Sequence, residues 1–121
     1  MSIIFTTIKG DKELNYGYGM FRAYRIMLAK QLDPTLGLVY ADTMMLLRNP
    51  NLFNQRFNEV IAHDKFRPYD DVLQFLCMPD CEGKISAKLC RRIATIMKDD
   101  DDELTEMIKW CANNRRKLVW H

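Results

Sequence analysis

Several features that commonly reveal a protein's function are missing from this sequence. It contains no apolar run long enough to span a bilayer, and its first residues, "MSIIFTTIKGDKE", lack the basic leader and apolar core of a signal peptide. It also lacks a phosphate-binding glycine loop, a G-x-S-x-G motif and an H-E-x-x-H motif. Because no pattern assembles a nucleophile, a base and oxyanion donors, we expect a cytoplasmic protein that is not an enzyme, binds no cofactor and acts on no membrane.

A strong charge of either sign is missing as well. The chain has 18 Lys and Arg against 16 Asp and Glu, which gives a formal net charge of +2. Dedicated nucleic-acid binders usually carry a larger basic excess, because phosphate contacts supply much of their affinity. Any nucleic-acid binding by this chain is therefore expected at a local basic patch.

Metal ligands are sparse and poorly spaced. The cysteines are Cys77, Cys81, Cys90 and Cys111, and the histidines are His63 and His121. No C-x-x-C pair occurs, whereas structural zinc sites usually draw ligands from such pairs, so we expect no metal site. In a reducing compartment the cysteines are expected to be free thiols, and Cys90 and Cys111 fall on apolar helix faces.

The passage "DCEGKI" imitates the middle of a calcium-binding EF-hand loop. If Gly83 is the sixth residue of such a loop, Asp80 and Glu82 fall on ligand positions, but the first and twelfth positions are Met78 and Leu89. The two strongest ligands are thus missing. We predict instead a turn between two helices, in which Gly83 adopts a positive φ and Gly83→Ala costs on the order of 1 kcal/mol.

The length and the apolar content predict one domain, residues 1–121, because 121 residues with 48% hydrophobic content can bury a core of their own. Residues 2–8 are rich in β-branched and aromatic side chains and predict a strand. The other strand is expected at "KLVW", residues 117–120, paired with the first so that the chain ends lie together. The predicted fold class is α+β: a mainly helical single domain with a small sheet formed by the N-terminal and C-terminal strands.

Hydrophobic periodicity, proline and glycine divide the rest of the chain into helices. We expect helices from residue 20 to Asp33-Pro34, over 38–47 and 51–64, from Pro68 to Met78-Pro79, after Ser86 as N-cap, and between the acidic run 99–103 and the basic run 115–117. Their apolar stripes predict these buried side chains: Met20, Phe21, Tyr24, Met27, Leu28, Phe53, Phe57, Val60, Ile61, Val72, Leu73, Leu76, Leu89, Cys90, Ile93, Ile96, Met97, Leu104, Met107, Ile108 and Cys111.

Four passages together resemble a group of small uncharacterised bacterial and phage-type proteins. They are "YGYGMFRAYR" (16–25), "RPYDDVLQFL" (67–76), "DCEGKISAKLC" (80–90) and "MIKWCANNRRKLVWH" (107–121). In that group an aromatic and basic segment opens a helix, a D-C-[DE]-G-x-I turn precedes another helix, and a short strand ends the chain. This chain has Met78-Pro79 where the group often has His-Ser, which removes a possible polar ligand. No activity is established for the group, so the resemblance implies the architecture and leaves the function open.

The segment "NYGYGMFRAYR" is the first candidate for an interaction surface. It concentrates tyrosines and arginines around two glycines, and these residue types often anchor protein interfaces. The candidate partner-binding residues are Tyr16, Tyr18, Arg22 and Arg25. The alternative interpretation is structural, with the aromatic residues in the core and the arginines in solvent.

The basic C-terminal end is the second candidate. Arg115, Arg116 and Lys117 lie near Trp120, and cations beside an aromatic ring suit a phosphate backbone with a stacked base. Helix capping explains the same charges without a ligand. We therefore expect a protein-binding module, such as an inhibitor, immunity or accessory protein of a phage or mobile element (anti-defence type), with nucleic-acid binding as the alternative and the oligomeric state undetermined.

Overall fold

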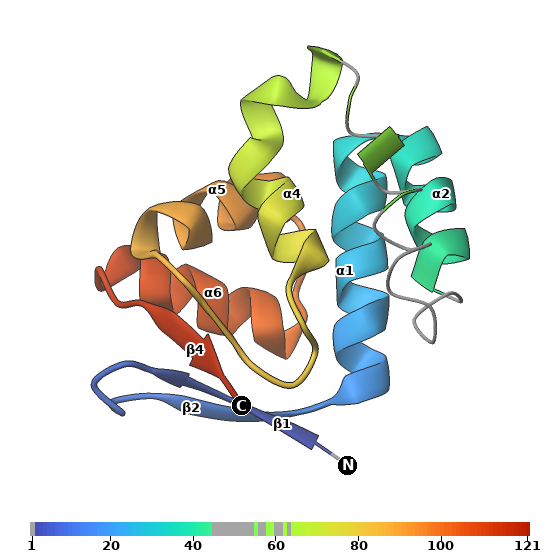
Figure 1. Ribbon diagram of the computed structural model, residues 1–121. Coiled ribbons are helices and arrows are strands. Elements are labelled where there is room, and N and C mark those ends of the chain that lie inside the picture. Colours follow the sequence, from blue (N-terminus) through green and yellow to red (C-terminus); the bar gives the residue numbers. More distant parts are fainter. Residues whose placement is uncertain (1, 45–54, 56–57, 60–61, 63) are drawn as a thin grey trace.

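The two ends of the chain meet in one antiparallel sheet, as the sequence predicts. The structure is a computed structural model that describes residues 2–44, 55, 58–59, 62 and 64–121 (Figure 1). Strand β1 (Ser2–Thr7) pairs with β4 (Leu118–Trp120), and Phe5 stands opposite Trp120. Backbone hydrogen bonds between Ile4 and His121, 2.9 and 3.2 Å long, extend this pairing.

Two further strands complete the sheet, and the sequence analysis missed both. Strand β2 (Glu13–Gly17) pairs with β1, and β3 (Gly83–Ile85) pairs with β4, which gives the order β2-β1-β4-β3. The alternation of Leu14 and Tyr16 with two polar residues was a signal for β2. Strand β3 has three residues, which is too short to show a period of two.

The helices gather on one face of the sheet, so the fold is α+β and mainly helical (Figure 1). They are α1 (Tyr18–Leu32), α2 (Pro34–Met44), the 3-10 helix η1 (Asp64–Tyr69), α4 (Asp70–Cys77), α5 (Ala87–Ile96) and α6 (Glu103–Asn113). No helix in the described ranges is long and apolar enough to cross a membrane. The helix predicted over 51–64, with its apolar residues Phe53, Phe57, Val60 and Ile61, falls on a stretch that is largely outside the described residues.

Local signals placed most of the helix ends correctly. Ser86 caps α5 by accepting a hydrogen bond from the Leu89 backbone, 3.1 Å long, and α4 ends at Cys77 with Met78 as its C-cap, as predicted. The predicted start of α4 at Pro68 is wrong, because Pro68 lies inside η1 and α4 begins at Asp70. Helix α2 begins four residues before its predicted start, because Asp33 accepts a hydrogen bond from the Leu36 backbone and Pro34 suits the first helical position.

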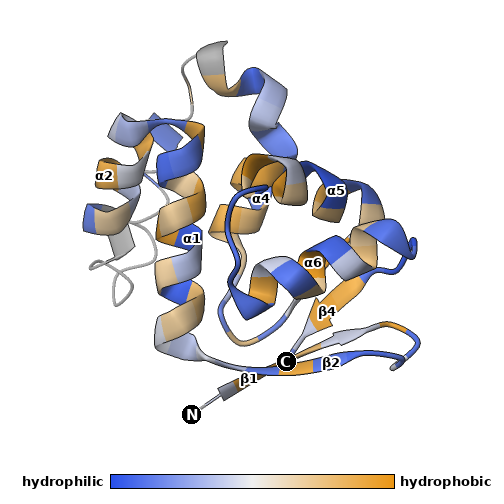
Figure 2. Cartoon of the chain, turned by 180° about the vertical axis from the view of Figure 1, so that it is seen from behind, coloured by the Kyte–Doolittle hydropathy of each residue, from blue (hydrophilic) through white to orange (hydrophobic). Residues whose placement is uncertain are grey.

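The core lies between the sheet and the helices, and its centre is aromatic. Phe5, Phe21, Phe75 and Trp120 form contacts with ring centroids 5.2 to 5.9 Å apart. Figure 2 shows apolar segments turned inward on the helices around this centre. The predicted buried side chains in the described residues of α4, α5 and α6 are buried, except Ile96, which is half-buried.

The buried face of helix α1 differs from the predicted one, because two side chains predicted to be buried are exposed. Phe21, Tyr24 and Leu28 are buried, but Met20 and Met27 are 51% and 49% exposed. The buried face is rotated toward position 25, which follows Phe21 by four residues and precedes Leu28 by three. Met20 and Met27 therefore stand at the edge of the buried face, on the surface.

The prediction of a positive φ at Gly83 is wrong. Among the described glycines only Gly10 has a positive φ, whereas Gly83 opens strand β3 opposite Trp120. A methyl group built on Gly83 overlaps the atoms of the Trp120 ring. Glycine is needed here because the indole ring lies directly against the backbone.

We expect Gly83→Ala to lower the free energy of unfolding by about 3 kcal/mol, the upper end for overpacking, because the buried Trp120 ring has no room to withdraw. Chemical denaturation would measure the change. Gly19→Ala is the matched control: its methyl group meets no atom within 4 Å, so stability should stay the same or rise by up to about 1 kcal/mol. Equal stability of Gly83→Ala and the native protein would contradict this account.

Candidate functional site

An open hollow of about 790 Å³ lies where strand β2 passes into helix α1. We call it the α1 hollow. Its lining is formed by Gly17, Tyr18, Gly19, Met20, Arg22, Asp80 and Cys81. Two segments far apart in the sequence thus form one surface, the start of α1 and the loop after α4.

The local sequence explains why this hollow stays open. Helix α1 begins at Tyr18 directly after β2, and its N-cap residue, Gly17, has extended backbone angles and no capping side chain. Gly17 and Gly19 contribute no side chains to fill the space. As a result Tyr18 is half-buried, while Met20 and Arg22 extend from the first turns of α1 into solvent.

A buried ion pair fixes the far wall of the hollow to α1. The guanidinium of Arg25 pairs with Asp80, and these side chains are 2% and 15% exposed. Arg22, which is 48% exposed, adds a second hydrogen bond to the other carboxylate oxygen of Asp80, 3.0 Å long. One carboxylate therefore binds two arginines that are three residues apart on α1.

Arg25 also caps the end of helix α4. Its Nη1 atom donates to the backbone carbonyl of Met78 at 2.5 Å and lies 3.4 Å from those of Phe75 and Leu76. Its guanidinium lies over the Phe21 ring, 4.2 Å from the centroid. The last carbonyls of a helix carry partial negative charge, so a cation there is stabilised. Burial lowers the pKa of the Arg25 guanidinium from its ordinary value, and the nearby Tyr40 and Cys77 oppose that shift.

The four predicted partner-binding residues divide into two groups. Tyr18 and Arg22 reach the surface of the hollow. Tyr16 and Arg25 are buried, so the expectation that they belong to an exposed surface is wrong. Strand β2 directs Tyr16 to the inner face of the sheet, and the helical period puts Arg25 on the face of α1 that also carries Phe21 and Leu28.

Buried hydroxyl groups connect the other side of α1 to the start of α6. Tyr16 donates to Asp102, the N-cap of α6, at 2.8 Å, and Tyr24 shares a 2.7 Å hydrogen bond with Thr105. Thr105 donates in turn to Asp100 at 2.6 Å. Burial and the hydrogen bond to Asp102 raise the pKa of Tyr16, and burial raises that of Tyr24.

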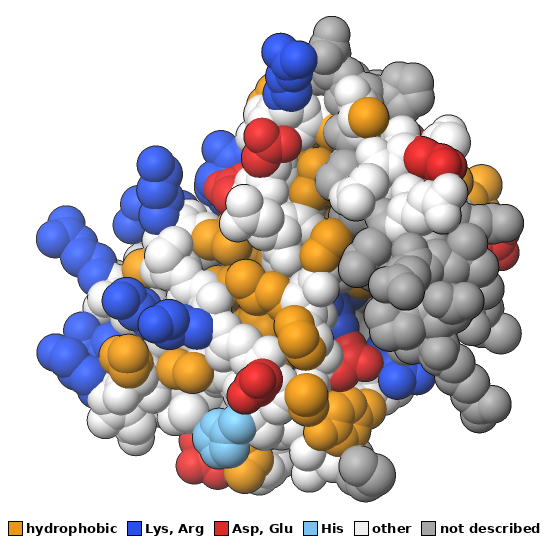
Figure 3. All heavy atoms as spheres, viewed as in Figure 1, with side chains coloured by type: hydrophobic (Ala, Val, Ile, Leu, Met, Phe, Trp, Pro, Cys, Tyr) orange, Lys and Arg blue, Asp and Glu red, His pale blue; other side chains and the backbone are white. Residues whose placement is uncertain are grey.

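The basic C-terminal end, the candidate surface for nucleic acid, does not expose its aromatic residue. Trp120 is 1% exposed, and its indole donates to the Pro79 carbonyl at 3.2 Å, so the prediction of a stacking surface at Trp120 is wrong. The ring is buried because β4 directs it into the core, where it contacts Phe5, Phe21 and Phe75. Arg116 pairs with Asp11, whereas Arg115 and Lys117 are exposed. Figure 3 shows Lys and Arg side chains gathered on the side of α5.

Cys90 and Cys111 are buried, as the sequence predicts, and the other two cysteines are exposed. Cys90 and Cys111 face each other between α5 and α6, and the hydrogen bond between them, together with burial, raises the pKa of Cys90. Cys77 and Cys81 are exposed at the end of α4 and in the loop after it. Within the described part of the chain, no three His, Cys, Asp or Glu side chains come close enough to hold a metal ion.

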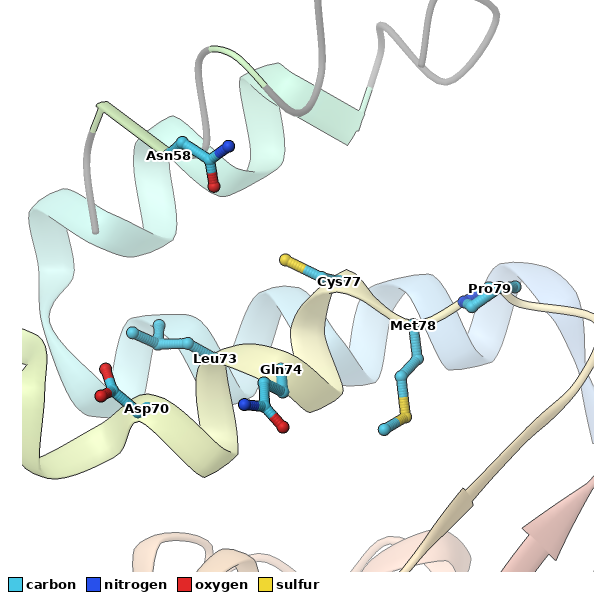
Figure 4. A pocket seen from close by; sticks show the side chains of 7 residues that line it. All are labelled: Asn58, Asp70, Leu73, Gln74, Cys77, Met78 and Pro79. Atoms are coloured by element: carbon cyan, nitrogen blue, oxygen red, sulfur yellow. The ribbon is translucent and has the colours of Figure 1, made fainter. Parts of the chain in front are cut away.

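A second hollow, of about 590 Å³, lies beside α4 (Figure 4). The side chains of Cys77 and Asn58 extend into it from opposite sides, and Met78 points away. Its described lining contains a thiol but no histidine that would act as a base. His63, the internal imidazole of the sequence, lies outside the described residues. The described lining of this hollow therefore does not pair the Cys77 thiol with an imidazole.

Comparisons with protein-family models, with curated proteins and with solved structures find no match to this chain. The site must be interpreted from its own geometry. That geometry provides an open surface on a fixed frame, with exposed aromatic, thioether and guanidinium groups.

Replacement of Arg25 by methionine should destabilise the protein far more than the same change at Arg22. We expect Arg25→Met to cost about 3 kcal/mol, because it leaves the Asp80 carboxylate and the carbonyls of α4 without their buried donor. Arg22→Met removes an exposed pair and should cost less than about 1 kcal/mol. Denaturation midpoints of the two variants would test the difference, and equal midpoints would contradict the capping role of Arg25.

The buried tyrosines should make the protein sensitive to alkali. Burial raises the pKa of Tyr40, which donates to the Leu76 carbonyl, to about 12, and the pKa values of Tyr16 and Tyr24 are raised too. The unfolded chain loses these protons near pH 10, before the folded protein does, so the free energy of unfolding should fall as the pH rises above about 10. Tyr40→Phe should reduce that slope. Phenolate absorbance of the folded protein that titrates only near pH 10 would contradict it.

Proposed function

We propose that this protein is a non-enzymatic, cytoplasmic protein-binding module whose partner docks at the α1 hollow. One observation carries the proposal: exposed side chains of Met20 and Arg22 and the half-buried ring of Tyr18 surround an open hollow in a rigid frame. Tyrosine, methionine and arginine are the residue types that protein interfaces concentrate. A fixed frame favours binding further, because little conformational freedom is lost on association.

The shape of the hollow favours a protein over a small metabolite. It is open on one side, whereas sites for small molecules usually enclose most of the ligand. The finer part of the proposal rests on the kind of role that small proteins of mobile elements often have, because no activity is established for the group that the sequence resembles. We suggest that the module acts as an inhibitor, immunity or accessory protein of a phage or mobile element, of the anti-defence type.

The rival function is nucleic-acid binding through the basic side of the molecule. Lys84, Lys88, Arg91, Arg115 and Lys117 are all exposed. Without Trp120 this surface offers phosphate contacts but no stacking platform, and phosphate contacts alone give weak, salt-sensitive binding. Protein binding is therefore the better-supported proposal.

Native thiols allow a direct test, because Cys81 lines the α1 hollow and Cys77 lines the other one. A photo-activated crosslinker would be attached to Cys81 in a Cys77→Ser variant, and to Cys77 in a Cys81→Ser variant as the matched control. Each protein would be irradiated in extract of the native host, with and without nuclease treatment. We expect a specific protein adduct from the Cys81 label only.

The same assay also has outcomes that would contradict the proposed function. Combining Tyr18→Ala with Met20→Ala should reduce the Cys81 adduct at least about tenfold, since interface anchors typically contribute more than 1 kcal/mol each. Equal adducts from both labels would show that the hollow is not the docking surface. Adducts that vanish with nuclease and depend on Lys88 and Arg91 would favour the rival function.

A further inference from the structure

Two exposed methionines on α1 mark a groove that continues from the α1 hollow. Met20 and Met27 are separated by seven residues, so they lie on one face of the helix, with the exposed Ala23 between them. Met20 lines both the α1 hollow and the next depression along the helix. Thioether side chains are flexible and polarizable, which suits a surface that adapts to a partner's apolar residues.

The connection between α5 and α6 forms the opposite wall of the groove. Figure 2 shows this hydrophilic connection running beside α1. Two adjoining depressions of about 170 and 160 Å³ lie between them and share Met27, Met97 and Asp100. Each is large enough for one aliphatic side chain. We call this surface, from Met20 to Met27 and across to residues 96–102, the methionine groove.

Carboxylates dominate the charge around the methionine groove, and Lys98 is the one cation within its far wall at residues 96–102. The run "DDDDE" at 99–103 follows its far wall, and among the residues that the structure describes no lysine or arginine lines either depression. Asp100 and Asp102 are held by Thr105 and Tyr16. Asp99 and Asp101 are exposed. The nearby cations on α1 point elsewhere, because Arg22 binds Asp80 and Lys30 packs against Gly37 of α2.

The depression beside Met20 is mainly apolar, the next one is mainly polar and contains Asp99 and Asp100, and this combination fits one kind of occupant. We infer that the methionine groove binds a lysine- or arginine-rich segment of the partner protein that presents apolar side chains at helical spacing. An apolar side chain occupies the depression beside Met20, and the cations lie at the polar depression and against residues 99–103. This inference rests on the proposed function and adds the chemistry of the partner. Charge pairing at such an exposed rim steers association and weakens as salt screens it.

Two synthetic helical peptides would test the inference directly. Both carry leucines at the same helical spacing, and the other positions are lysine in one and glutamate in the other. The protein, labelled with ¹³C at its methionine methyl groups, would be titrated with each. We expect the lysine peptide to shift the Met20, Met27 and Met97 signals, with an affinity that falls at high salt, and the glutamate peptide to shift none of them.

Matched variants separate the effect of the groove's own charge on peptide affinity from the effect of the protein's net charge. Asp99→Asn with Asp101→Asn should weaken the lysine peptide at least about fivefold. Glu13→Gln with Asp42→Asn, exposed acids on β2 and α2, makes the same change in net charge and should leave the affinity within about twofold.

Several outcomes would overturn the inference. The first is equal binding of both peptides, and the second is a set of shifts confined to methionines outside the groove. The third is a change of the groove signals on dilution without peptide, because that change would assign the groove to a second copy of this chain. If Cys81 captures a partner whose affinity is the same for the Asp99 and Asp101 variant, the inference fails and the proposed function stands. Loss of the Cys81 adduct while the lysine peptide still binds the groove would contradict the proposed function and not the inference.

Discussion

The buried guanidinium of Arg25 is the interaction on which the rest of this structure depends. It connects α1, the C-terminal end of α4 and Asp80 in the loop that follows. A buried ion pair adds little net stability over an apolar substitute, but loss of one partner is costly, because the other is left charged and unpaired. Arg25 therefore specifies where the loop lies more than it adds to the total free energy of folding.

The position of that loop decides the edge of the sheet. Pro79, the residue before Asp80 in this loop, accepts a hydrogen bond from the Trp120 indole. Gly83 then allows β3 to lie directly against the same ring. The Trp120 ring also contacts Phe5, Phe21 and Phe75 in the centre of the core. A polar cap on one helix is thus coupled, through a loop, to the aromatic core and to the strand that joins the chain ends.

This coupling gives the candidate surface its character. The hydrogen bonds of Asp80 on one side of α1, and those of Tyr16 and Tyr24 on the other, hold the backbone around α1. The side chains that face solvent between these two anchors include flexible methionines. Fixed backbone and adaptable side chains together suit a surface that binds a protein segment, since the entropy lost on binding is confined to a few side chains.

The sequence by itself determined the elements whose causes are local. Periodicity placed the described core residues of α4, α5 and α6, Ser86 and Asp33-Pro34 marked helix ends, and β-branched residues marked β1. Tertiary structure alone decided which face of α1 is buried, that Arg25, Tyr16 and Trp120 lie inside, and that Gly83 meets a ring rather than forming a turn. Those outcomes depend on partners 37 to 86 residues away in the chain, Trp120 for Gly83 and Asp102 for Tyr16 among them. The reason is physical: an arginine or tyrosine side chain is stable inside only where a distant group completes its hydrogen bonds, and no local pattern records that group.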